Sequence, residues 1–161
     1  MVARMLIVTL ATLLLAAGCD RSDPTAAEAT AALGMLAWSV RLPTDLSEHD
    51  QVGVILRHGD GREIRGGGGA GFAAPNEVVR VLLWPDETGA HMRWAVVSRS
   101  GTMRGMLSDV PTRTGIQVYP NAGRTIGPED LMIKGSEAGS VSSDNTLEPG
   151  EYGYMLVVQR Q

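Results

Sequence analysis

The sequence predicts an all-β domain, either a sandwich or a barrel, and two observations lead to this fold class. Apolar residues recur at every second position in several short segments, which is the period of a strand with one buried face. Gly, Pro, Asn and Thr separate these segments at short intervals, as turns between strands do. A helix is expected at most in the leader before the domain, so the packed layers must be sheets.

Three parts are expected along the 161 residues. Residues 1–18 have a positive start and then an uncharged apolar run too short to span a bilayer, which is the composition of an export signal that is removed. Residues 19–34 are poor in bulky apolar side chains, as a tether must be, although Asp23 and Pro24 would suit the start of a short helix. Residues 35–161 have the size of one domain with its own core.

Nine strands are expected in this domain. In the first strand, Trp38 and Val40 point toward the core and Ser39 points away from it. The last strand has Tyr152 and Tyr154 on one face, with apolar residues on both faces. The candidates are residues 35–42, 52–58, a short segment around 64, 78–84, 91–97, 103–107, 116–119, 131–134 and 152–158.

A glycine run at 66–71 contains the pattern G-x-G-x-x-G, which cradles phosphate in dinucleotide-binding folds. That pattern works only where a helix N-terminus follows it, and here Phe72 is followed by two alanines and Pro75. We therefore expect a flexible loop without a dinucleotide.

The clearest hairpin joins residues 78–84 to residues 91–97. If Trp84 pairs with His91, then Leu83 faces Met92 and the other apolar residues of the two strands form one inner face. The outer face then carries an aromatic and several basic side chains, which suit ligand binding by stacking or by cation–π contact, unless the tryptophan only covers a sheet edge. The candidate binding surface is Trp84, His91, Arg93 and Arg80.

Charge and cysteine content limit the function. Without residues 1–18 the chain has 13 basic and 18 acidic residues, a formal charge of −5, which argues against nucleic acid as a partner. Cys19 is the only cysteine, so the domain has no disulfide, and no cofactor motif or nucleophile elbow is present. We expect no cofactor and no enzymatic activity, with a hydrolase as the least favoured reading.

Methionines offer an alternative function. Met103 and Met106 form an M-x-x-M pair and His91 is nearby in sequence, and thioether ligands select Cu(I). A periplasmic copper carrier is therefore the second reading, against the ordinary use of methionine as a core filler.

Residues 147–152 resemble the tyrosine corner, L-x-P-G-x-Y, of Greek-key sandwiches. The residues that match are Leu147, Pro149, Gly150 and Tyr152. The resemblance implies an immunoglobulin-like, antiparallel Greek-key sandwich of about seven to nine strands, in which the Tyr152 hydroxyl reaches backbone a few residues upstream. It indicates a fold and no particular function.

The end of the expected signal resembles the lipobox of bacterial lipoproteins. Ala17, Gly18 and Cys19 match it, while Ala16 stands where leucine is more frequent. The resemblance implies cleavage before Cys19, a diacylglyceryl thioether on its sulfur and usually an amide-linked acyl chain such as palmitate. Asp20 resembles the signal that retains enterobacterial lipoproteins in the inner membrane.

These observations favour a non-catalytic binding or accessory module of the bacterial cell envelope, held on the membrane through Cys19 and facing the periplasm or the exterior. Its partner is expected to be an envelope protein or a small ligand. The oligomeric state does not follow from the sequence.

Overall fold

A computed structural model describes residues 35–108, 116–136, 139–142 and 144–161, and these residues form an all-β structure as predicted. The expected signal, Cys19 and the tether lie outside the described residues. No helix occurs within the described ranges. The strands are β1 (Leu36–Arg41), β2 (Gln51–His58), β3 (Glu63–Ala70), β4 (Val78–Pro85), β5 (Met92–Ser98), β6 (Gly101–Leu107), β7 (Ile116–Val118), β8 (Thr125–Ile126), β9 (Ile133–Ser136) and β10 (Glu151–Gln159).

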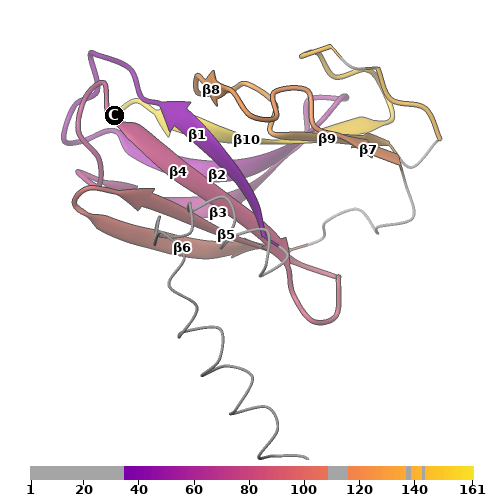
Figure 1. The fold of residues 1–161 in the computed structure, drawn as a ribbon, viewed down its shortest axis with the longest axis horizontal. Helices are drawn as coiled ribbons and strands as arrows, with labels where there is room; N and C mark the ends of the chain where they lie inside the picture. The colour runs from indigo at the N-terminus through magenta and orange to yellow at the C-terminus, as the bar shows by residue number, and fades with distance from the viewer. Residues whose placement is uncertain (1–34, 109–115, 137–138, 143) are drawn as a thin grey trace, which may run out of the picture. The chain divides into compact units, whose positions relative to one another are not determined.

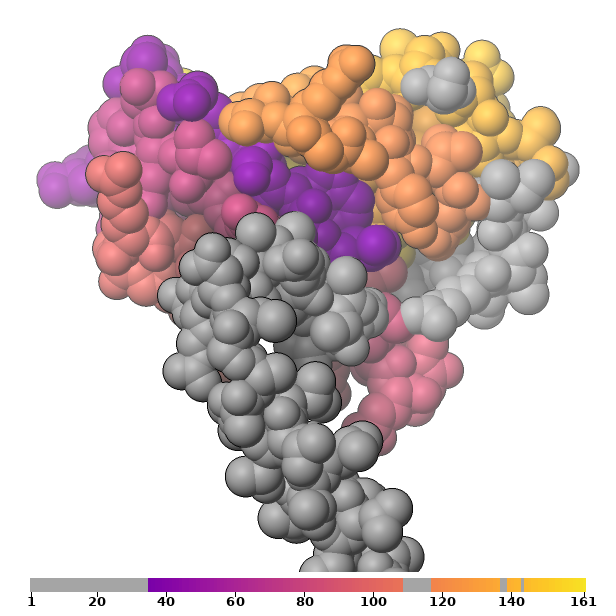
Figure 2. Space-filling view, viewed as in Figure 1, coloured from indigo at the N-terminus to yellow at the C-terminus, as the bar shows by residue number. Residues whose placement is uncertain are grey.

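Two five-stranded sheets pack face to face as a β-sandwich. The front sheet has the order β6-β5-β4-β1-β8 and the back sheet has the order β3-β2-β10-β9-β7. All pairs are antiparallel except β1 and β8. Figure 1 shows β1 and β4 crossing in front of β2 and β10. In Figure 2 the indigo surface of β1 lies beside the orange surface of the segment that contains β8.

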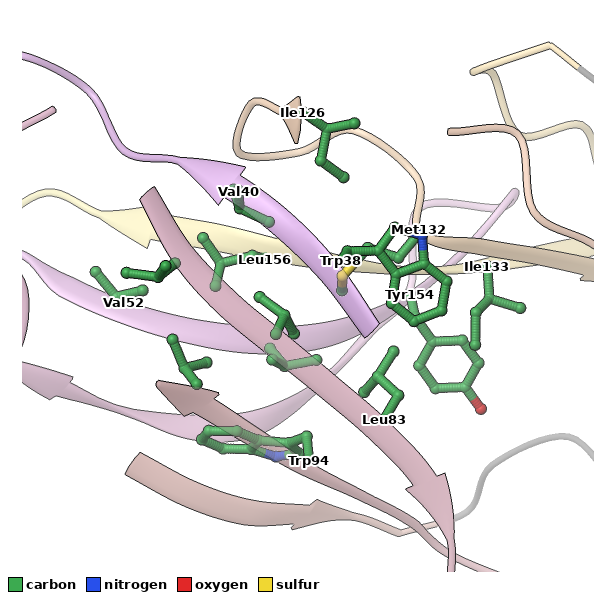
Figure 3. Close-up of a cluster of buried hydrophobic side chains, with 14 of the residues drawn as sticks. Trp38, Val40, Val52, Leu83, Trp94, Ile126, Met132, Ile133, Tyr154 and Leu156 are labelled. Carbon is green, nitrogen blue, oxygen red and sulfur yellow. The ribbon is translucent and has the colours of Figure 1, made fainter. Parts of the chain in front are cut away.

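The inner faces of the two sheets form one core. Trp38 and Val40 of β1 point inward as expected, and so do Tyr154 and Leu156 of β10 (Figure 3). The six residues predicted for the inner face of the β4–β5 hairpin are all buried: Val79, Val81, Leu83, Met92, Trp94 and Val96. Burial of alternate residues on both sheets is what holds the layers together.

The register of this hairpin differs from the prediction by two residues. Trp84 pairs with Arg93, and Pro85 pairs with Met92. His91 lies outside the strand, at the end of a loop over residues 86–91 that the Asp86 amide closes by donating to the His91 carbonyl at 3.0 Å. Since side chains alternate with a period of two, a slip of two residues leaves every side chain that lies within β4 and β5 on its predicted face.

The glycine run is a strand rather than the expected loop. Gly66 to Gly69 belong to β3, and the pairing with β2 shifts register between Gly53 and Ile55, next to Gly67, which has φ +80°. The Trp94 ring of the front sheet lies against the backbone of Gly66 on β3 and Gly105 on β6, and a Cβ at either glycine would overlap the ring. Glycine is therefore needed here so that β3 can approach a large aromatic side chain.

Candidate functional site: the outer face of the front sheet

The outer face of the front sheet carries one arginine in each of four successive cross-strand rows. These arginines come from four adjacent strands, and apolar side chains fill most of the other positions. Rows on one face are about 7 Å apart along the strands, so the arginines extend over about 20 Å. From one end to the other, the rows hold Trp84, Arg93 and Met106; then Ala37, Leu82, Ala95 and Arg104; then Ser39, Arg80, Val97 and Thr102; and finally Arg41 and Val78. We call this surface the arginine face.

No acidic residue occupies any of these rows. The acidic residues of the described chain lie instead in the turns at the ends of the sandwich and on the back sheet, as Asp45, Glu87 and Glu129 illustrate. A protein of net charge −4 therefore presents one sheet face that is purely cationic. Such segregation creates a local positive potential that the net charge conceals.

The arginines of this face have no carboxylate partner among the described residues. The arginine and lysine ion pairs there involve Arg57, Arg65, Arg160 and Lys134. Arg41 donates to the carbonyl and the amide oxygen of Asn76, at 3.4 and 3.3 Å. As far as the described residues go, no carboxylate of the chain competes with an external acceptor for these guanidinium groups.

Three apolar side chains on the arginine face are exposed, although Ala95 in its second row is buried. Met106 is 48% exposed, Val78 is 42% exposed and Val97 is 36% exposed, whereas Trp84 and Leu82 are half-buried. Three of the four predicted binding residues, Trp84, Arg80 and Arg93, do lie here. Exposed apolar groups between cations are typical of a surface that meets another surface.

His91, the fourth predicted binding residue, is held in the β4–β5 loop instead. Its Nδ1 lies 3.0 Å from Asp86 Oδ2. Burial would raise the pKa of Asp86, but hydrogen bonds from Thr88 and His91 outweigh it and lower this pKa to about 2. His91 is thus part of a loop-closing contact and does not share the face with the arginines.

Two hollows flank Arg41 at the far end of the face. One has a volume of about 730 Å³ and extends toward Arg99 and Ser100. The other has a volume of about 430 Å³ and extends toward Thr125 and Pro128. Both are open and lined largely by loop residues, so neither forms an enclosed ligand site.

The alternative copper ligands do not come together. Met103 pairs with the buried Val96 and packs against the core, while Met106 pairs with Arg93 on the outer face. A spacing of three residues places side chains on opposite faces of a strand, so β6 separates these two thioethers. In the described part of the chain, no group of three or more His, Cys, Asp and Glu residues is placed to hold a metal ion.

The tyrosine-corner residues lie on the back sheet. Pro149 and Gly150 form a tight turn, in which Gly150 has φ +89° and the Glu151 amide donates to the Glu148 carbonyl at 2.9 Å. The Tyr152 hydroxyl accepts a hydrogen bond from the side chain of Gln117, whose Nε2 lies 3.2 Å away. The resemblance had implied a hydrogen bond to backbone a few residues upstream instead. The ring reaches β7 by lying over Gly135 of β9, where a Cβ would overlap it.

Sequence reasoning missed a buried charged cluster on the outer face of the back sheet. Lys134, the only lysine, is fully buried, and its Nζ lies 3.0 Å from both Asp144 Oδ1 and Glu151 Oε2 and 2.6 Å from Ser142 Oγ. Burial would lower the pKa of Lys134, but the hydrogen bonds to Asp144 and Glu151 raise it above its usual value. The sequence signal was a single lysine directly after Met132 and Ile133.

No family model matches the chain, and no curated protein sequence or solved structure is significantly similar to it. The arrangement of its own residues is therefore the basis for assigning a function. Within the described ranges, no helix has the length and apolar character needed to cross a bilayer.

Proposed function

We propose that this chain is a lipid-anchored protein of the bacterial cell envelope that works by binding through its arginine face. The observation that carries the proposal is a set of four arginines without a carboxylate partner among the described residues, interleaved with exposed apolar side chains: Arg41, Arg80, Arg93 and Arg104. A guanidinium group is a strong, directional hydrogen-bond donor to phosphate and carboxylate, and the sheet presents these groups on one side. The partner is therefore anionic and offers an extended surface.

The anchor in this proposal is Cys19, which follows Ala17 and Gly18 at the end of an apolar run. Two or more acyl chains would hold the protein on the membrane almost permanently, because each buried methylene contributes about 0.8 kcal/mol. Anchoring would confine the arginine face to partners at or near that membrane.

The anchor is tested by labelled palmitate in cells that express the chain. We expect the wild type to incorporate the label, and the Cys19→Ala variant to remain as an unlabelled precursor. Label on the variant, or none on the wild type, would show that the chain is not a lipoprotein.

The binding role is tested by chemical cross-linking in intact envelopes, followed by recovery of the chain with both lipids and proteins attached. We expect Arg80→Ala, Arg93→Ala and Arg104→Ala together to remove most of the cross-linked material. The matched control is Arg62→Ala, Arg65→Ala and Arg99→Ala, which removes the same charge from exposed sites outside the face. Equal recovery from both triple variants would rule out the arginine face as the binding site.

A further inference from the structure

We propose that the arginine face docks on the anionic phospholipid headgroups of the membrane to which the chain is anchored. This inference deepens the proposed function and relies on its lipid anchor. It names the partner as phosphate groups presented by a bilayer surface, in preference to an acidic protein.

The spacing of the arginines suits a surface of phosphate groups. Each cross-strand row contributes one guanidinium from a different strand, so the four charges are distributed over an area of about 20 by 15 Å instead of converging on one point. A single small anion can engage only one or two groups so separated. A bilayer leaflet rich in anionic lipid offers many phosphates over the same area, and basic residues near such a leaflet are attracted to it.

The apolar residues between the arginines suit the same partner. Trp84 and Met106 flank Arg93 in the first row, and both are at least partly accessible. Tryptophan is favoured at the depth of lipid headgroups because its ring is apolar and its N–H can still donate. Met106 and Val97 would remove apolar surface from water when the face lies against the membrane.

The position of the tether favours a membrane over an acidic protein. Residues 19–34 lead directly to β1, which is itself a strand of the arginine-bearing sheet. A flexible tether of sixteen residues, as the sequence predicts, would have an average reach of about 20–25 Å and would keep the domain close to the bilayer that holds Cys19. Tethering of this length gives an effective concentration in the millimolar range, at which even a weak surface attraction leads to docking.

The experiment uses the full-length lipidated chain reconstituted in vesicles, with Trp84 as the reporter. Trp38 and Trp94 are buried, at 4% and 1% exposure, so a nitroxide on the lipid headgroup should quench mainly Trp84 when the face is docked. We expect strong quenching in vesicles that contain phosphatidylglycerol and little in vesicles of phosphatidylcholine alone. The Trp84→Phe variant should lose this lipid-dependent signal, which verifies the reporter.

Variants then test the face itself. Each arginine near an anionic surface contributes roughly a fivefold preference, so Arg80→Ala, Arg93→Ala and Arg104→Ala together should shift the ratio of docked to undocked chain by about a hundredfold. The control variant combines Arg62→Ala, Arg65→Ala and Arg99→Ala, which lie off the face. It should shift the ratio of docked to undocked chain by less than about twentyfold, a fifth of the change expected for the face. High salt should release the wild type, because ions screen exposed charges.

Three results would overturn the inference. Equal quenching in both kinds of vesicle would show that anionic lipid is not recognised. Equal loss in the two triple variants would show that net charge matters and the face does not. Absence of quenching in phosphatidylglycerol vesicles would show that the arginine face does not lie against the headgroups.

Other experiments test the proposed function independently of membrane docking. Palmitate labelling tests whether the chain is lipid-anchored, and envelope cross-linking tests whether the arginine face binds any partner. If the arginines prove necessary for cross-linking to proteins while Trp84 is never quenched, the binding role stands and the membrane is not its partner. If unlabelled chain added to preformed vesicles still prefers phosphatidylglycerol through the same arginines, the docking face stands without the anchor.

Discussion

The outer faces of the two sheets differ in whether their basic residues have acidic partners among the described residues. On the back sheet, the segment around Asp144 lies over β9 and β10, and Lys134 is buried against Asp144 and Glu151. On the front sheet, four arginines have no carboxylate partner among the described residues. A cation that the fold itself neutralises contributes to structure, whereas one that the fold leaves unpaired is available for an external anion.

The back face also contains a second, smaller apolar cluster, which has no counterpart among the described residues of the front face. Ile55, Met155 and Val157 are buried there beneath Leu131 and Leu147. Asn145 fastens the covering segment, since its Oδ1 accepts from the Leu131 amide at 3.0 Å and its Nδ2 donates to Asp130 at 2.9 Å. Substitutions on the back face should therefore change stability, and substitutions on the arginine face should change binding.

The largest expected change in stability comes from truncating a core tryptophan, compared with truncating a tryptophan on the arginine face. Trp94→Ala should cost about 3–5 kcal/mol of unfolding free energy, as large core truncations do. Trp84→Ala should cost about 1 kcal/mol or less because its side chain is only half-buried. Chemical denaturation of both variants shows which substitution costs more unfolding free energy. If Trp84→Ala proves as costly as Trp94→Ala, the front sheet is covered on both sides and the comparison fails.

Lys134 gives the next largest effect. Lys134→Met should cost about 3 kcal/mol, because Glu151 would remain buried without its cation. The matched control, Arg65→Ala, removes one partner of an exposed pair with Glu63 and should cost less than about 1 kcal/mol. A companion variant, Lys134→Met with Glu151→Gln, should recover part of the loss by removing the unpaired charge. A Lys134→Met protein as stable as the wild type would show that the cluster is not structural.

The stability of the protein should depend on pH through the cluster of Lys134, Asp144 and Glu151. Hydrogen bonds from Lys134 lower the pKa of Asp144 below its usual 3.8, and the Glu148 amide together with Lys134 lowers the pKa of Glu151 below 4.5 despite burial. Their stabilisation is therefore complete above about pH 5 and is lost as the pH falls through the folded values. The raised pKa of Lys134 has the opposite sign, so its stabilisation holds below 10.5 and is lost as the pH rises further.

Unfolding midpoints measured from pH 7 to pH 3 test this expectation. The wild type should lose stability on acidification, and Lys134→Met should lose less because its carboxylates have already lost their cation. Asp86→Asn is the control, since it removes another carboxylate of lowered pKa that is remote in sequence from this cluster. Equal acid sensitivity in the wild type and Lys134→Met would place the titrating groups elsewhere.

Tyr152 should give a smaller effect. Tyr152→Phe should cost about 1 kcal/mol, the usual net contribution of one hydrogen bond, here the bond from Gln117. Gln117→Leu should cost a similar amount, and the double variant should cost less than the sum of the two. Purely additive costs would show that the two side chains do not depend on each other.

Sequence patterns predicted the faces of the strands but not the way distant strands combine. Trp84, Arg80 and Arg93 were placed correctly on the outer face because alternation survives a two-residue error in register. Arg41 and Arg104 join them only because β1 and β6 lie on either side of the β4–β5 hairpin, and this order depends on contacts between distant segments.

The features that the sequence did not predict depend on contacts between segments that are distant along the chain. The glycine run at 66–71 predicts a loop, yet Gly66 is a strand residue. Together with Gly105, which lies in the strand predicted at 103–107, it makes room for Trp94, a requirement seen only when β3, β5 and β6 meet. Lys134 was overlooked because the carboxylates that neutralise it are 10 and 17 residues further along the chain. Sequence reasoning therefore found part of the arginine face and none of the charged cluster.

The smallest expected change in stability belongs to the arginine face, and it is the sharpest test of the comparison. Arg80→Ala, Arg93→Ala and Arg104→Ala together should alter the unfolding free energy by less than about 1 kcal/mol, because none of these side chains has a carboxylate partner among the described residues to lose. Removal of three like charges from one face should even offset part of the lost packing, most visibly at low salt. Chemical denaturation at low and high salt measures both effects. A loss as large as that of Lys134→Met would mean that these arginines hold the sandwich together, and the two outer faces would then use their cations in the same way.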